Sequence, residues 1–196
     1  MADLVFKYGS MGSSKSAFAL MLRWSFLECG QNVLLLKPSV DDRDGVSNIR
    51  SRVGIEAPCK TFSPEDRITT KFIDDLLACD VIIVDEAQFS TRKQVDELKA
   101  ISEEMNKPVY AFGLRTDFQT NMFEGSKRLF ELANKIEALP KKCECGNEAI
   151  VNARYDESGI VYDGEQVVLG SNDKYNTRRP RTAFSCSTRR GAASAS

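Results

Sequence analysis

The sequence predicts an α/β fold built on a parallel sheet, followed by a second, smaller β-rich domain. Short apolar runs alternate with helical patterns from Leu4 to about Leu139, which is the order expected of strand–helix–strand units. The runs are apolar at consecutive positions, as is typical of strands that are buried on both faces. After Pro140 the sequence pattern changes to paired cysteines and short strand-like segments.

Length and charge limit the classes of function. The 196 residues are enough for one full core and a small appendage. The 27 basic and 28 acidic side chains nearly cancel, which argues against nucleic acid or a membrane surface as a partner. No apolar run approaches the roughly 20 residues of a spanning helix, and Met1 leads directly into a strand, so we expect a cytoplasmic protein. Histidine is absent, so carboxylates must carry any proton transfer.

The octet from Gly9 to Ser16 predicts a phosphate-binding loop. It joins the first strand, Leu4–Tyr8, to a helical pattern over Ser16–Cys29. In such a loop small residues leave backbone N–H groups free for phosphate oxygens, and the following helix adds the positive end of its dipole. Lys15 would span the outer phosphates, and the hydroxyl of Ser16 would bind magnesium.

The loop departs from the usual pattern at one position. The spacing G-x-x-x-x-G-K-[ST] places a glycine where this chain has Ser14. Glycine tolerates a positive φ, so we expect strain on the order of 1 kcal/mol at Ser14 or an altered loop. The alternative reading of the octet is a glycine- and serine-rich turn with one lysine.

The next elements continue the sheet. Val33–Leu36 is a second buried strand, at a distance that suits a right-handed crossover and hence parallel pairing. Residues 37–60 are polar with little periodicity, which predicts a long mobile loop. Ser63 followed by Pro64 predicts the start of a helix that reaches about Ala78.

The strand Asp80–Val84 ends in two adjacent carboxylates, Asp85 and Glu86. At the carboxyl edge of a sheet, beside a phosphate loop, one acid can orient magnesium while its neighbour acts as a base. The alternative is an acidic entry to the next helix, because Thr91 and Gln94 have the spacing of a capping box.

The strand Pro108–Gly113 runs into a polar and aromatic segment, Leu114–Gln119, which predicts a pocket wall at the same edge. Phe118 and Phe123 are equally consistent with core packing of a helix over residues 123–134. Residues 136–139 add one further expected strand.

Domain boundaries are expected near Pro140 and Arg178. Residues 1–139 form the nucleotide-binding domain, 140–177 the small domain and 178–196 a disordered tail. Within the small domain, residues 160–162 and 166–169 flank Asp163-Gly164, which predicts a hairpin. Cys143 and Cys145 have the character of half a zinc site, yet four ligands are needed and the only cysteine downstream is Cys186.

Together these motifs resemble the type II thymidine kinase family over about residues 3–175. The resemblance rests on the phosphate loop with Met11 and on several further segments in order, namely residues 41–43, 85–89, 113–118, 123–126, 145–146 and 164–175. It implies a RecA-like core joined to a zinc-bearing domain whose lasso loop, about residues 164–177 here, closes over thymidine. It also implies magnesium-ATP as phosphoryl donor, feedback inhibition by thymidine triphosphate, and a homotetramer or homodimer.

The resemblance assigns roles to individual residues. ATP and magnesium would be held by Gly9, Ser10, Met11, Gly12, Ser13, Ser14, Lys15, Ser16, Arg43, Asp85 and Gln88, with Ser16 and Asp85 at the magnesium. The catalytic base would be Glu86. Thymidine would be contacted by Met11, Phe89, Leu114, Phe118, Phe123, Val168 and Tyr175.

Three departures from the family pattern leave other functions open. Besides Ser14, Ser171 replaces a lasso glycine, and Arg179 stands where a zinc-binding cysteine is expected. A guanidinium cannot bind a cation, so we expect an incomplete zinc site with substoichiometric metal. The alternatives are a catalytically weak or non-catalytic nucleotide-binding protein and, against the net charge of −1, a zinc-ribbon nucleic-acid binder.

Overall fold

The chain forms a six-stranded parallel sheet in the order β5-β2-β6-β7-β1-β8. The computed structural model describes residues 1–40, 47–143, 146–156, 159–161, 164 and 175–178. The strands of this sheet are β1 (Leu4–Tyr8), β2 (Val33–Pro38), β5 (Lys60–Phe62), β6 (Val81–Val84), β7 (Val109–Gly113) and β8 (Lys135–Ala138). Every adjacent pair is parallel, so the predicted fold class is confirmed.

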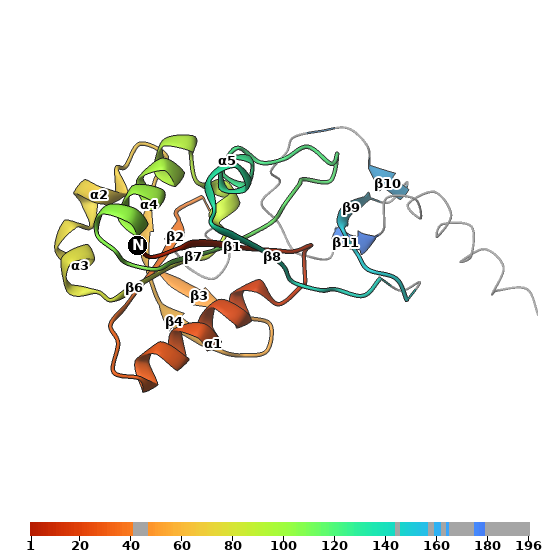
Figure 1. Cartoon of the computed structure of the whole chain (residues 1–196). Coiled ribbons are helices and arrows are strands. Elements are labelled where there is room, and N and C mark those ends of the chain that lie inside the picture. Colours follow the sequence, from red (N-terminus) through yellow and green to blue (C-terminus); the bar gives the residue numbers. More distant parts are fainter. Residues whose placement is uncertain (41–46, 144–145, 157–158, 162–163, 165–174, 179–196) are drawn as a thin grey trace, which may run out of the picture.

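The alternation of side chains along the strands divides the core into two halves. Leu34 and Leu36 of β2 point into one cluster, whereas Leu35 between them points into the other. The first cluster is covered by α2 (Ile68–Lys71), α3 (Ile73–Ala78), α4 (Arg92–Glu104) and α5 (Glu124–Leu132). The second is covered by α1 (Lys15–Glu28), which lies beneath the sheet in Figure 1, together with Ile49 and Ala57.

The predicted loop over residues 37–60 is wrong in its described part. β2 continues to Pro38, and β3 (Asn48–Arg50) pairs antiparallel with β4 (Glu56–Pro58) before β5 joins the main sheet. β3 and β4 each bury one residue, Ile49 and Ala57, between more exposed neighbours. Three-residue strands of this kind are too short to show a period. Residues 41–46, including the predicted ligand Arg43, lie outside the described part.

The predicted helix from Ser63 to Ala78 is also wrong at its start. The Ser63 N–H donates to Asp66 Oδ2 at 2.7 Å, and the Gln94 amide donates to the carbonyl oxygens of Ser63 and Asp66 at 2.7 and 2.9 Å. Residues 63–66 are therefore held as a turn against α4, and the helical part begins at Ile68 and breaks at the buried Phe72. The capping box at Thr91 and Gln94 is confirmed, so Gln94 both caps α4 and fixes this turn.

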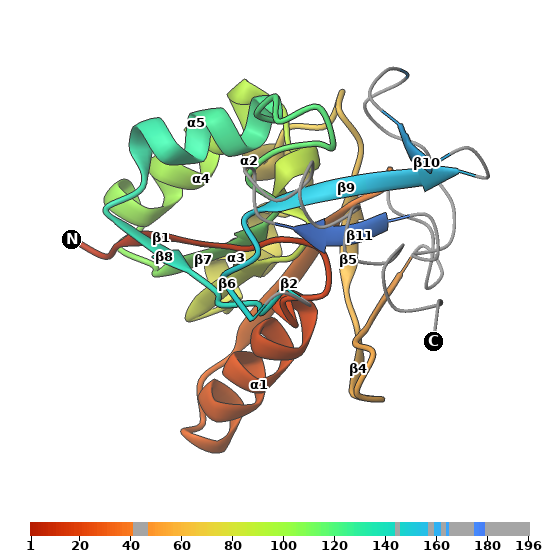
Figure 2. The same cartoon turned by 90° about the vertical axis from the view of Figure 1, so that its right-hand side faces the viewer.

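A second, three-stranded sheet stands beside the carboxyl edge of the main sheet (Figure 2). Its strands are β9 (Val151–Asp156), β10 (Gly159–Val161) and β11 (Tyr175–Arg178), antiparallel in the order β10-β9-β11. The partner of the predicted hairpin, residues 166–169, lies outside the described part. Arg178 belongs to β11, so a tail would begin after it; residues 179–196 are not described. The boundary after residue 139 stays a prediction.

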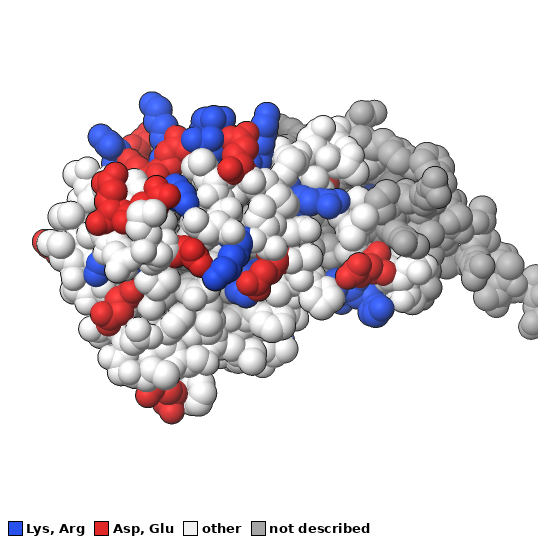
Figure 3. All heavy atoms as spheres, in the orientation of Figure 1, with Lys and Arg blue, Asp and Glu red and all other residues white. Residues whose placement is uncertain are grey.

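The two faces of the main domain differ in surface chemistry. Charged side chains gather over α4 and α5, whereas the visible surface of α1 is almost free of them (Figure 3). On α1, Trp24 is 62% and Met21 54% exposed, and Phe18 and Leu27 are exposed too. Among the described residues, none of the helices has the length and apolar character needed to cross a membrane.

We predict that Gly125→Ala destabilises the fold through the short 3-10 turn η1 (Ala87–Phe89), on which α5 packs. A Cβ at Gly125 would lie 2.6 Å from the carbonyl oxygens of both Ala87 and Ser90. Alanine inside a helix normally adds roughly 0.5–1 kcal/mol of stability, but overpacking of this kind costs about 1–3 kcal/mol. We therefore expect a net loss, seen as a lower urea midpoint by circular dichroism.

The matched control for this prediction is Lys127→Ala, at an exposed position of the same helix. It should leave the midpoint unchanged or raise it. If the Gly125→Ala protein were as stable as the control, α5 would not be in tight contact with η1.

Candidate functional site

The site lies where β1, β6 and β7 end, at the carboxyl edge of the main sheet. The loop after β1 is tied to its neighbour because the Gly9 N–H donates to the Gly113 carbonyl at 3.2 Å. Lys15 is buried, and its Nζ donates to the Ser10 carbonyl at 2.9 Å. The buried hydroxyls of Ser10 and Ser13 have no hydrogen-bond partner among the described protein atoms. The loop thus folds round the lysine with two hydroxyls left for a polar ligand.

Ser14 has a left-handed backbone conformation, with φ of 61° and ψ of 27°. It is the N-cap of α1, but its side chain makes no capping hydrogen bond. A left-handed conformation costs a residue with a Cβ of order 1–3 kcal/mol where the surroundings impose it. The strain expected at this position is therefore present, and it explains physically why glycine is usual here.

Asp85 follows β6 directly and is 2% exposed. Burial, together with the nearby charge of Glu86, raises the pKa of this carboxyl to about 7 against a hydrogen bond from Ser16 and the charge of Lys15, which lower it. Its Oδ1 has no hydrogen-bond partner among the described protein atoms. A buried carboxylate that contacts a hydroxyl and keeps an unpaired oxygen suits magnesium, which takes one or two protein oxygens plus phosphates and water.

Glu86 has a left-handed backbone as well, with φ of 51°. The residue turns the chain from β6 into η1, so its side chain leaves the strand in a different direction from that of Asp85. The Gln88 Nε2 donates to Glu86 Oε2, and the Gln88 Oε1 accepts from the Leu114 N–H at 3.0 Å. Gln88 is 2% exposed and so joins the glutamate to the segment after β7.

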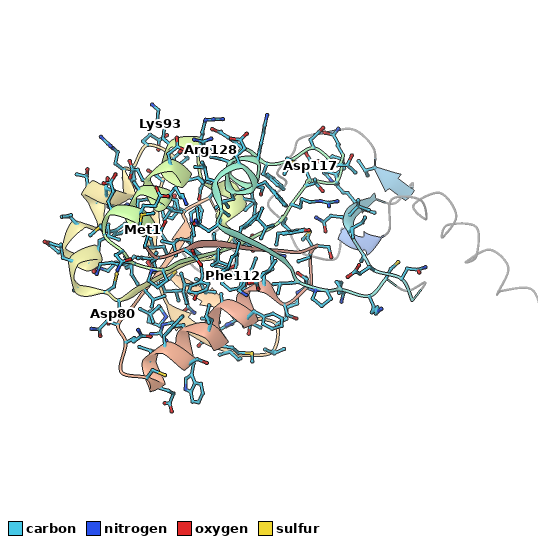
Figure 4. The ribbon with its side chains drawn as sticks, in the orientation of Figure 1. Met1, Asp80, Lys93, Phe112, Asp117 and Arg128 are labelled. Atoms are coloured by element: carbon cyan, nitrogen blue, oxygen red, sulfur yellow. The ribbon has the colours of Figure 1, made fainter. Side chains whose placement is uncertain are left out.

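The segment from Leu114 to Met122 forms the outer wall of the site. Ser126 Oγ donates to the Leu114 carbonyl, and Asp117 Oδ1 accepts the backbone N–H groups of Gln119 and Asn121 at 2.9 Å each. In Figure 4 this wall, marked by Asp117, reaches toward the three-stranded sheet, whereas Phe112 lies between the main sheet and α1. Asp117 therefore gives the wall a fixed shape through an Asx-type turn.

Aromatic rings line the same edge. Phe89 and Phe123 meet edge to face with centroids 5.7 Å apart, and the guanidinium of Arg154 lies 5.3 Å from the centre of the Phe118 ring. The packing of Phe118 under a cation from β9 agrees better with the predicted wall than with a place in the helix core.

The structure brings most of the predicted site residues together. The described ones at this edge are Gly9, Ser10, Met11, Gly12, Ser13, Ser14, Lys15, Ser16, Asp85, Glu86, Gln88, Phe89, Leu114, Phe118 and Phe123. Tyr175 pairs with Arg154 across β11 and β9, although its side chain is not described. Val168 lies outside the described part, as does Arg43.

The zinc site stays a prediction. Cys143 is a buried free thiol, whereas Cys145 and Cys186 lie outside the described part. Where the structure is described, no group of three or more histidine, cysteine or acidic side chains is placed to hold a metal.

Two residues of β9 contact the site although no pattern in the sequence indicates them. Asn152 Oδ1 accepts the Met11 N–H at 2.7 Å, and Arg154 covers Phe118 as described above. Polar residues at alternate positions of a strand normally indicate a solvent-facing side. Here that side faces the phosphate loop instead.

The family model and the sequence relatives that match this chain agree on one family. A thymidine kinase family model matches residues 2–181. A thymidine kinase of Rhodopirellula baltica is 40% identical over 182 residues, 90% of this chain and 85% of that protein. The thymidine kinase of Enterobacteria phage T4 is 40% identical over 87% of this chain and 90% of its own. The solved structure of Bacteroides Pif1 bound to ssDNA is more distant, at 18% identity and a TM-score of 0.42 over 71% of this chain and 38% of that one.

We predict that Ser14→Gly stabilises the protein by about 1 kcal/mol. Glycine removes the left-handed strain of roughly 1–3 kcal/mol, and the greater freedom of the unfolded chain returns about 0.4–1 kcal/mol of it. The measurement is the free energy of unfolding in urea, followed by circular dichroism. Ser14→Ala is the control, since it keeps the Cβ and should bring no gain; a glycine variant no more stable than this control would show that the loop is unstrained.

Proposed function

We propose that this chain, which belongs to the thymidine kinase family, transfers the γ-phosphoryl group of ATP to the 5′-hydroxyl of thymidine, giving dTMP and ADP. The observation that carries the proposal is the meeting of Ser16, Asp85 and Glu86 at one edge of the sheet, next to the loop around Lys15. Phosphoryl transfer needs mainly positioning and charge stabilisation, which such a constellation supplies.

The phosphate loop and β6 have separate tasks in this proposal. Backbone N–H groups of residues 12–16 and the N-terminus of α1 hold the outer phosphates of ATP, with Lys15 spanning them. Ser16 and Asp85 would hold magnesium, which neutralises charge on the phosphates when bound. A cation bound there would favour the carboxylate form of Asp85 and so oppose the burial that raises its pKa.

Glu86 is the base of the proposed reaction. Its carboxylate accepts the proton of the 5′-hydroxyl as the bond from O5′ to the γ-phosphorus forms and the bond from that phosphorus to the β-γ bridging oxygen breaks. The hydrogen bond from Gln88 holds the carboxylate and the Leu114 segment in one arrangement. Gln88 then positions Glu86 rather than only contacting ATP.

Thymidine occupies the aromatic edge of the site in this proposal. The resemblance assigns its pocket to Met11, Phe89, Leu114, Phe118, Phe123, Val168 and Tyr175. The ring contact of Phe89 with Phe123 and the position of Phe118 under Arg154 support this assignment. The resemblance likewise assigns Arg43 to charge stabilisation and thymidine triphosphate to feedback inhibition. We further propose a cytoplasmic location, in keeping with the free thiols of Cys79 and Cys143.

A catalytically weak or non-catalytic nucleotide-binding protein is the second candidate. The observation that favours it is the strained Ser14, because a distorted loop presents its N–H groups less well to phosphates. Ser14→Gly distinguishes the two, since in a working kinase it should improve the use of ATP and leave the affinity for thymidine unchanged.

A homodimer or homotetramer is proposed from the exposed apolar side of α1. A helix that is apolar on all sides is normally buried, yet Phe18, Met21, Trp24 and Leu27 all remain exposed in one copy of the chain. A second copy pairing through the same helix would cover all four. Isologous contacts of this kind close into dimers.

We predict that Glu86→Gln abolishes turnover while both substrates still bind. Loss of a general base commonly lowers the rate by about 10²- to 10⁴-fold, and glutamine keeps the size of the side chain. Turnover is measured with radiolabelled thymidine and ATP, and binding by calorimetry. The control is the same change at the exposed Glu104 of α4, which should keep full activity; a Glu86→Gln protein with near-normal turnover would remove Glu86 from the base role.

We predict that Trp24→Glu lowers the oligomeric state. A charge buried at the contact between two copies is unfavourable unless it is paired, so the variant should elute as a smaller species in light-scattering chromatography. Lys127→Glu, on the opposite side of the sheet, serves as control and should keep the state of the unaltered protein. An unchanged mass for Trp24→Glu would show that the copies do not associate through α1.

A further inference from the structure

We propose that Asn152 is a positioning residue that couples the ATP site to the thymidine site. The residue belongs to β9 of the three-stranded sheet, yet it is 4% exposed and its side chain serves two loops of the main domain. Its Oδ1 accepts the N–H of Met11 in the phosphate loop at 2.7 Å. Its Nδ2 donates to the carbonyl of Thr116, in the wall of the nucleoside pocket, at 3.2 Å.

The chemistry of asparagine suits this double contact. A single short side chain offers both an acceptor and a donor, so one amide plane pairs an N–H from one loop with a C=O from the other. Loss of the amide would leave the Met11 N–H and the Thr116 carbonyl without these partners, and buried groups of this kind are costly to leave unpaired. The relative position of the two loops therefore depends on Asn152.

The space around Asn152 increases the importance of these two bonds. A pocket of about 120 Å³ lies beside it, and its lining includes Tyr8, Gly9, Ser10, Ala149 and Ile150 as well as Asn152 itself. Where a pocket replaces packed side chains, movement of one wall is not resisted by van der Waals contact. The two hydrogen bonds of Asn152 therefore contribute much of what holds the phosphate loop and the Thr116 segment in their relative position.

The backbone of β9 fixes the base of the side chain. Asn152 lies opposite Thr177 of β11, two residues along from the pair formed by Arg154 and Tyr175. The same strand thus bears Asn152 on the phosphate loop and Arg154 on Phe118. Thymidine bound against Phe118 would hold β9 in place through Arg154. Asn152 of the same strand would then hold Met11 in its position in the phosphate loop.

The inference rests on the proposed function, because it assumes that phosphates occupy the loop and that the nucleoside lies at Phe118. Its consequence is that each substrate strengthens the binding of the other. Coupling between two sites is reciprocal and typically amounts to roughly 5- to 150-fold in affinity. Removal of the link should bring this factor close to one.

The experiment measures the affinity of the full-length protein for magnesium and AMP-PNP by calorimetry, with and without saturating thymidine. In the unaltered protein thymidine should tighten AMP-PNP binding by a factor within the range given above. Asn152→Leu, which removes both hydrogen bonds, should weaken AMP-PNP binding and abolish the factor. Asn152→Asp keeps the acceptor for Met11 but not the donor for Thr116, so it should also lose the factor, and its buried negative charge beside the phosphate loop should weaken AMP-PNP binding as well.

Controls separate this inference from loss of structure and from failure of the proposed function. Asn147→Leu makes the matched change at an exposed position of the same region and should keep the factor; circular dichroism checks that every variant is folded. Asp and Leu variants that retain the unaltered coupling factor, or an unaltered protein that shows none, would overturn the role of Asn152. Coupled binding without any transfer to thymidine would instead overturn the proposed kinase reaction and leave the inference standing.

Discussion

The approach of Ser16 to the buried Asp85 carboxylate is the contact on which the arrangement of the site depends. It joins the first turn of α1 to the end of β6, two elements that meet only because the sheet between them is parallel and its carboxyl ends share one edge. An unpaired oxygen of Asp85 at this depth is unfavourable in the absence of a cation. The burial of Asp85 therefore favours the binding of the cation that the proposed reaction requires.

Backbone strain is present at the same place. Ser14 and Glu86 are two of the four non-glycine residues with a positive φ in the described part of the chain, and they are the N-caps of α1 and η1. Strained backbone persists where the surrounding structure determines it, and here the surroundings are the rigid strands on one side and the hydrogen bonds of Lys15 and Gln88 on the other. The stable sheet thus maintains the unfavourable backbone conformations of Ser14 and Glu86 at the site.

The sequence predicted the parts of this structure that depend on local pattern. Long apolar strands, the capping box at Thr91 and the loop around Lys15 follow from residue order alone, and so did the strain at Ser14. The three-residue strands around Ile49 and Ala57 show no period, and the turn at Ser63 is decided by Gln94, which lies 31 residues away in the chain. The role of Asn152 was equally out of reach, because it depends on a contact across 141 positions of sequence.

The exposed side of α1 also decides how this protein can be observed. Trp24 is the single tryptophan of the chain, and 62% of its surface is in water in one copy. Its fluorescence in a lone folded chain would already resemble that of an indole in solvent, so emission spectra are a poor measure of unfolding. When another surface covers α1, the same indole becomes shielded from water and its emission changes. The intrinsic fluorescence of the protein therefore reports association without an added label.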